Sequence, residues 1–282
     1  MTFGQITFGQ MTLGKMQMEW LGLFFVGTFT GLLAGIFGLG GGFLLIPLLS
    51  ALGIPVAEAA GTSLIAVWFS AIAGSSLNWF KNKLDARKSV QIALLGIPAA
   101  QLGVVVSNLF PDRLLKLIFA VLLLGMIYLM NLRQQLSEQE LDIKLALSPP
   151  TPGATGRKFY WWQYASIGAV SGFMSGLFGI GGGLIMVPLQ LGFLAETLES
   201  AVANSLGAMV AIAASGLIGH AWRSEVLWIP GLCLGAGSIF GAPLGSYILP
   251  RLPNGLVTTA FRLLLLVLSI YMMRASWAGG FG

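Results

Sequence analysis

The stretch GLFGIGGGLIMVP at Gly176–Pro188 decides the fold, because GIFGLGGGFLLIP at Gly35–Pro47 says nearly the same thing earlier in the chain. Both runs place several glycines and a proline inside strongly apolar sequence. Glycine adopts positive φ angles without strain, and an interrupted helix inside a bilayer requires protein or water around its free backbone groups. We therefore expect two deliberate helix breaks at membrane depth.

The composition is that of a membrane protein. Of the 282 residues, 56% are hydrophobic and 9% are charged, whereas a soluble domain carries about a quarter charged residues. Most of the apolar stretches have the roughly 17–25 residues that a membrane helix requires. These long stretches are Trp20–Phe37, Ala59–Phe80, Val90–Phe110, Leu114–Leu132, Trp161–Phe178, Leu198–Trp222, Val226–Leu249 and Leu256–Met273.

Two further apolar stretches, Phe43–Leu52 and Leu184–Phe193, are too short to cross a bilayer. About ten helical residues span roughly 15 Å, half of a hydrocarbon core about 30 Å thick. We expect each to be a half-helix that begins directly after its glycine run.

The chain is internally duplicated. Gly31–Pro47 aligns with Gly172–Pro188, and after a single inserted residue the register continues by pairing Ser63 with Ser205. The predicted fold class is all-α: a polytopic membrane protein of two homologous halves, each with a glycine-broken half-helix hairpin plus three or four spanning helices. The predicted organisation is a flexible tail (1–19), a first membrane repeat (20–132), a cytoplasmic linker (133–158), a second membrane repeat (159–274) and a C-terminal tail (275–282).

The orientation of the two halves stays open at this point. Re-entrant hairpins leave three spans per half and make the repeats inverted, whereas four full spans make them parallel. Basic residues cluster in two places, which the positive-inside rule assigns to the cytoplasm: the loop containing Lys81, Lys83, Arg87 and Lys88, and the linker containing Arg133, Lys144, Arg157 and Lys158.

Several function classes are excluded or unsupported by the sequence. A single cysteine and a single histidine give no basis for a thiolate cluster or a histidine metal site. No nucleophile constellation or intramembrane carboxylate pair indicates an enzyme. We therefore predict no catalytic residue, no cofactor and no metal, and we attribute the net charge of +5 to membrane topology rather than to nucleic-acid binding.

The glycine runs predict an anion site. The first N–H groups of a helix lack intrahelical partners and carry the positive end of the helix dipole, so such an end binds anions. Two half-helix ends that meet near the bilayer centre would bind a small anion through backbone amides. The alternative is close helix packing, which we favour for the outer glycines at the small-xxx-small spacings Gly31–Gly35 and Gly172–Gly176.

The doubled GxFGxGGGxxxxP motif, followed by Gly61-Thr62-Ser63 in one half and Ala203-Asn204-Ser205 in the other, resembles the sulfite exporter TauE/SafE family, also called the toluene sulfonate uptake permease family. The resemblance covers about residues 20–274. It implies a multi-pass transporter in the plasma membrane, the bacterial inner membrane, that moves sulfite, organosulfonates or related small anions. Its signature residues are Gly38–Gly42, Gly179–Gly183, Pro47 and Pro188.

Polar residues in apolar segments complete the candidate site, because such groups are costly in a membrane. Their hydroxyl and amide groups either donate to an oxyanion or join helices and cap helix starts. The candidate substrate-binding residues are Gly38, Gly40, Gly41, Gly42, Thr62, Ser63, Gly179, Gly181, Gly182, Gly183, Gln190, Asn204 and Ser205.

Other polar groups fit a structural role better. We expect His220 to lie at the membrane interface beside Trp222, and we expect Glu58, Glu196 and Glu199 to be solvated helix starts rather than proton carriers.

The predicted function is a secondary transporter, an exporter of small sulfur-containing anions, that works by alternating access. The alternative is an anion channel or a transporter of other small carboxylates or oxyanions. The expected partners are a small anionic substrate and the lipid bilayer, with homodimerisation left open.

Overall fold

In the computed structural model the described residues are 13–37, 40–128, 161–194, 196–248 and 254–278, and they form helices without a strand. The expected linker 133–158 lies outside these residues. The helices are α1 (Leu13–Phe37), α2 (Gly42–Ala51), α3 (Val56–Phe80), α4 (Ala86–Leu109), an unlabelled helix over 112–128, α6 (Trp161–Phe178), α7 (Gly183–Phe193), α8 (Leu198–Trp222), α9 (Trp228–Ile248) and α10 (Asn254–Ala278).

The all-α prediction is confirmed for the described residues. Four helices, α3, α4, α8 and α9, contain a stretch long and apolar enough to cross a membrane. The two stretches expected to be half-helices form short helices, α2 with 10 residues and α7 with 11 residues. Helix α1 begins at Leu13, so it includes residues 13–19 that the sequence assigned to the N-terminal tail.

Helices α3 and α8 pack against each other in opposite directions. Gly61, near the start of α3, contacts His220 at the end of α8, and Gly74, near the end of α3, contacts Leu206 near the start of α8. We call the end of the molecule where α3 begins the α3-start end, and the opposite end, where α8 begins, the α8-start end.

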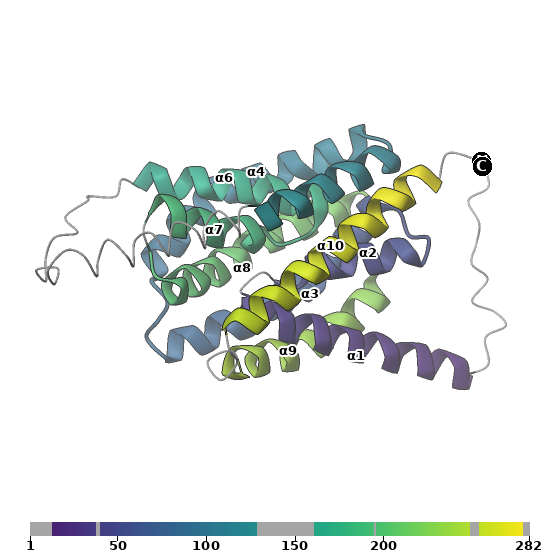
Figure 1. Cartoon of the computed structure of the whole chain (residues 1–282), viewed down its shortest axis with the longest axis horizontal. Helices are drawn as coiled ribbons and strands as arrows, with labels where there is room; N and C mark the ends of the chain where they lie inside the picture. Colours follow the sequence, from purple (N-terminus) through teal and green to yellow (C-terminus); the bar gives the residue numbers. More distant parts are fainter. Residues whose placement is uncertain (1–12, 38–39, 129–160, 195, 249–253, 279–282) are drawn as a thin grey trace, which may run out of the picture.

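Two parallel helix pairs flank this central pair. Helix α1 packs on α9, and α6 packs on α4, and Figure 1 shows these two pairs on opposite edges of the molecule. The pairs are parallel because a step toward the C-terminus of one helix contacts a residue further toward the C-terminus of the other. In α6 and α4, Gly168 contacts Ile92 and Gly172 contacts Gly96. An added Cβ on Gly172 would clash with the backbone of Gly96, which confirms that this outer glycine serves close packing.

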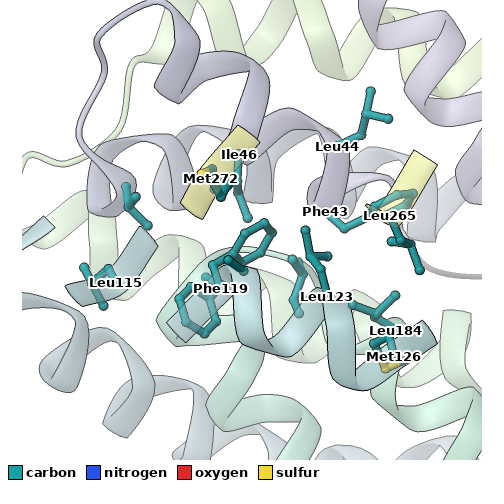
Figure 2. Packing of buried hydrophobic residues seen from close by; sticks show 14 of the residues in the cluster. Phe43, Leu44, Ile46, Leu115, Phe119, Leu123, Met126, Leu184, Leu265 and Met272 are labelled. Carbon is teal, nitrogen blue, oxygen red and sulfur yellow. The ribbon is translucent and has the colours of Figure 1, made fainter. Parts of the chain in front are cut away.

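An apolar cluster surrounds the starts of the two half-helices. It includes Phe43 of α2, Leu184 of α7, Phe119 of helix 112–128 and Leu265 of α10 (Figure 2), all fully buried. The ring centroids of Phe119 and Phe178 lie 5.2 Å apart. Lipid is itself apolar, so this cluster stabilises the fold mainly through van der Waals packing.

Candidate functional site

The first glycine turn consists of Gly40 and Gly41, directly before α2. Their φ angles are 78° and 72°, and Gly41 is the N-cap of α2. A Cβ atom on Gly41 would lie 2.8 Å from the carbonyl oxygen of Thr30 in α1. Both the left-handed backbone and the close approach therefore require glycine at position 41. Gly38, another candidate residue, lies outside the described residues.

The second glycine turn consists of Gly179–Gly182, directly before α7. Gly179, Gly181 and Gly182 have φ angles of 67°, 74° and 80°, and Gly182 is the N-cap of α7. A Cβ atom on Gly182 would lie 2.8 Å from the carbonyl oxygen of Ser171 in α6. The second turn thus repeats the geometry of the first, including the contact with the preceding helix.

The two glycine turns contact each other. A Cβ atom on Gly42 would clash with the carbonyl oxygen of Gly179 and would lie 3.0 Å from the Cα atom of Ile180. A Cβ atom on Gly40 would lie 3.6 Å from the carbonyl oxygen of Ile180. The structure therefore brings the candidate glycines of both halves together at the starts of α2 and α7.

Two apolar side chains, absent from the sequence prediction, lie against both turns. Val67 of α3 and Met209 of α8 are the nearest side chains to Gly40 and also to Gly181. Both are fully buried, and the predicted sequence register that pairs Ser63 with Ser205 also pairs these two positions. A valine and a methionine from the central helix pair thus cover the backbone of both turns.

Ser63 is the candidate hydroxyl that reaches a glycine turn. Its Oγ lies 2.9 Å from the carbonyl oxygen of Gly179 and 2.9 Å from that of Ala60, so its single hydrogen is donated to one of these two acceptors. Ser63 is fully buried and ties α3 to the second turn.

Gln190 and Ser205 form a second buried polar contact between α7 and α8. The amide nitrogen of Gln190 donates to Ser205 Oγ over 2.7 Å, and both residues are fully buried. The amide oxygen of Gln190 has no hydrogen-bond partner among the described residues. This oxygen only accepts hydrogen bonds, so it suits a donor group and not the oxygens of an anion.

Thr62 and Asn204, which the predicted sequence register pairs, make the same kind of contact. Thr62 Oγ1 accepts a hydrogen bond from the backbone N–H of Leu227 at 3.0 Å, before α9, and Asn204 Oδ1 accepts one from the N–H of Asp85 at 2.9 Å, before α4. The structure therefore directs these two candidate oxygens to helix starts, away from the glycine turns. Their contacts favour the capping alternative.

Glu196 is buried in a polar network, so the expectation of a solvated helix start is wrong for this residue. Its side chain is 6% exposed and its Oε1 lies 2.7 Å from Lys88 Nζ. Tyr164 donates to the same oxygen over 2.8 Å, and Ser200 donates to Oε2 over 3.2 Å. A buried charge is stable only with such partners. Because these partners lie on different helices, the carboxylate joins α4, α6 and α8 at the α8-start end.

His220 is fully buried, whereas Trp222, two residues later, is 84% exposed. The expected interface position is therefore wrong for the His220 side chain. Its Nε2 lies 2.8 Å from the carbonyl oxygen of Gly176, and its Nδ1 lies 2.7 Å from Glu225 Oε2. Sequence reasoning missed Glu225, although its nearness to the single histidine is visible in the chain.

Comparison with known proteins gives a consistent result. The family model described as sulfite exporter TauE/SafE matches residues 23–272. A probable membrane transporter protein of Bacillus subtilis, YunE, is 27% identical over 91% of this chain and 98% of its own length. Probable membrane transporter proteins of Xylella fastidiosa and Methanocaldococcus jannaschii are each 29% identical, over 89% and 70% of this chain and 94% and 71% of their own lengths. No solved structure matches the chain significantly.

Proposed function

Because the chain belongs to the sulfite exporter TauE/SafE family of membrane transporters, we propose that it exports small sulfur-containing anions, such as sulfite or organosulfonates, across the bacterial plasma membrane. The chain is a multi-pass membrane protein. The proposed mechanism is alternating access around an anion site at the two glycine turns. The observation that carries the proposal is the contact between these turns, each at the start of a half-length helix.

We propose that the chain consists of two halves and that these halves are inverted repeats. Equivalent helices α3 and α8 run in opposite directions, and the α1–α9 pair corresponds to the α6–α4 pair. Asn82 and Ser224, the non-glycine residues with positive φ in the described chain, are also equivalent positions in the register of the repeat. An inverted repeat supports alternating access because it provides two equivalent arrangements around one central site.

We propose that the first helix of each half and the half-helix after it form a re-entrant hairpin. The two hairpins are α1 with α2 and α6 with α7. In the second half, α6 approaches the end of α8, where the carbonyl of Gly176 meets His220. Helix α7 then returns to the start of α8, where Gln190 Nε2 lies 3.5 Å from the carbonyl oxygen of Ala201. A hairpin of this kind is tolerated in a bilayer because the surrounding helices cover its turn.

The proposed anion site uses the N-terminal amides of α2 and α7. The helix dipoles place partial positive charge at both glycine turns, and left-handed glycines leave the backbone open to close approach. Substrate entry would require Val67 and Met209 to move aside, since their side chains cover Gly40 and Gly181. Recognition through amides suits a sulfonate or sulfite, which presents several acceptor oxygens.

The proposed orientation follows the basic loop between α3 and α4. Lys81, Lys83 and Arg87 are exposed in or beside this loop, at the α8-start end, and the positive-inside rule assigns that end to the cytoplasm. The α3-start end would then face outward, and an exporter would release its anion there.

The test is counterflow in proteoliposomes. Vesicles containing the purified protein would be loaded with unlabelled sulfite, sulfoacetate, taurine or a simple carboxylate. Uptake of the same compound in radiolabelled form would then be compared with uptake by protein-free vesicles. Saturable counterflow of a sulfur-containing anion supports the proposal. Counterflow with carboxylates alone would replace the substrate class, and flux without saturation or exchange would indicate a channel.

A further inference from the structure

The pair formed by His220 and Glu225 is a buried ionisable site outside the glycine turns. Both ring nitrogens of His220 have partners: the backbone carbonyl of Gly176 at 2.8 Å and the carboxylate of Glu225 at 2.7 Å. The His220 side chain is fully buried, and the Glu225 side chain is 13% exposed. The pair lies at the α3-start end, where Glu225 is next to the surface of the molecule.

The hydrogen-bond distances are consistent with one proton shared by this pair. A carbonyl oxygen only accepts, so His220 Nε2 must carry a hydrogen that is donated to Gly176. Glu225 Oε2 and His220 Nδ1 lie 2.7 Å apart, a hydrogen-bond distance that requires one proton between them. That proton sits either on the ring, giving imidazolium with carboxylate, or on the acid, giving imidazole with carboxyl.

Loss of this proton would disrupt the contact. The pair is neutral overall while it holds the proton and carries one negative charge after release. The lone pair of Nδ1 would then face a carboxylate oxygen at the same distance, and an unpaired buried charge is strongly unfavourable. Glu225 would move away from His220 toward the nearby surface, which loosens the loop between α8 and α9.

The pair is mechanically connected to the second glycine turn. Gly176, whose carbonyl receives the His220 hydrogen bond, lies three residues before Gly179. Gly176 also packs directly on the backbone of Ala100 in α4, where an added Cβ would clash. Protonation of the pair therefore supports the position of the α6 end, and with it the turn that precedes α7.

The pair is confined to one half of the chain. In the register of the repeat, the positions equivalent to His220 and Glu225 are Asn78 and Lys83, which cannot share a proton in this way. The hydrogen bonds Glu225 N–H to His220 and Lys83 N–H to Asn78, both 3.0 Å to the carbonyl oxygen, show that the two loops otherwise match.

We infer that the His220–Glu225 pair, with its hydrogen bond to Gly176, binds the proton that couples anion transport to a pH gradient. This inference rests on the proposed transport function. Closed packing of the α8–α9 loop at the α3-start end requires the proton, and proton release at that end accompanies opening.

Other charged groups near this end have separate partners or positions. Arg223, on the same loop, donates to the carbonyl oxygen of Val104 in α4 over 3.2 Å. Asp112 pairs with Lys116 at 2.6 Å. Glu58 lies in the first turn of α3, three residues before Gly61, which contacts His220, and is partly exposed. On the α6 side, the ring of His220 faces the backbone carbonyl of Gly176, and on the α3 side its Cβ lies against Gly61.

The decisive variant is Glu225→Gln. Its amide would donate to Nδ1 of neutral His220 while Nε2 still donates to Gly176, so the contacts persist without a releasable proton. The matched control is Glu58→Gln, which removes an acid at the same end without touching the pair. His220→Gln is a second variant that also lacks the shared proton and retains an amide donor for Gly176.

The transport experiment uses radiolabelled sulfoacetate in proteoliposomes with an imposed pH gradient, applied in each direction. Wild type and Glu58→Gln should show gradient-dependent net flux, whereas Glu225→Gln, which keeps the closed packing without a releasable proton, should lose it. Gradient dependence in Glu225→Gln equal to that of the wild type would overturn the inference. Absence of sulfoacetate counterflow in every variant would count against the proposed substrate and not against the proton site.

A measurement without substrate tests the proton site alone. Since the proposed site binds a proton that holds the α8–α9 loop in place, the thermal stability of the wild-type protein should fall when rising pH removes that proton. Glu225→Gln and His220→Gln in detergent should lose less stability than wild type or Glu58→Gln. An identical pH slope in all four proteins would overturn the inference whatever is transported.

Discussion

Replacement of Gly182 by alanine tests the backbone requirement of the second glycine turn. Gly182 has a φ of 80°, and an L-residue in the left-handed region costs about 1–2 kcal/mol. The new methyl would lie 2.8 Å from the Ser171 carbonyl oxygen and 3.1 Å from Met186 Cε, and overpacking of this kind costs about 1–3 kcal/mol. We therefore expect Gly182→Ala to lower the free energy of unfolding by about 2–5 kcal/mol.

The matched control is Gly53→Ala. Gly53 has a φ of 82°, and an added Cβ there meets nothing within 4 Å, so this variant carries the backbone strain of about 1–2 kcal/mol without the clash. The difference between the two variants isolates the close approach between the turn and α6.

The assays are denaturant unfolding in detergent micelles and counterflow in proteoliposomes. We expect Gly182→Ala to be less stable than Gly53→Ala and to lose most of its counterflow, because the turn must shift away from Ser171 and carries its amides with it. Equal stability of the two variants would refute the packing argument. Near-normal counterflow in a destabilised Gly182→Ala would refute the link between the turn and transport.

The remaining predictions concern side chains around the turns. Thr62→Val should cost about 1–2 kcal/mol by leaving the N–H of Leu227 without its acceptor, with substrate affinity unchanged in binding titrations; weakened affinity at normal stability would return Thr62 to the site. Lys88→Met should cost about 1–3 kcal/mol in unfolding experiments, because Glu196 keeps the hydrogen bonds from Tyr164 and Ser200 but loses the charged donor Lys88; a neutral effect would show that the pair is solvated. Met209→Ala should cost about 2–5 kcal/mol and raise passive anion leak through the vesicles, and unchanged leak would argue against its covering role at the turns.

Local backbone features of the fold were predictable from the sequence. The glycine runs predicted where α2 and α7 begin, because positive φ and helix starts depend on short segments. Their apolar lengths predicted half-helices, which agree with the 10 and 11 residues of α2 and α7. The candidate binding role of these turns remains a prediction.

Contacts between side chains were much less predictable. Glu196 was expected in solvent, yet Lys88, distant in sequence, makes its ion pair. His220 was expected at the interface, yet Gly176 and Glu225 surround its ring. Such partners depend on which helices pack together, and a periodic pattern in one segment cannot specify the surface of another.

Sequence reasoning also overlooked Val67 and Met209 because valine and methionine are ordinary in apolar helices. Their pairing in the predicted sequence register was a usable signal. Only the packing of α3 on α8 brings them over the glycine turns.

The pairing of α1 with α9 has a consequence for biosynthesis. Gly27 and Gly31 pack on Leu234 and Ser238, which the ribosome adds about 200 residues later, roughly 10–40 s at ordinary elongation rates. During this interval the small-residue face of α1 lacks the neighbour that fits it. A chain truncated before α9 should therefore leave this face of α1 uncovered.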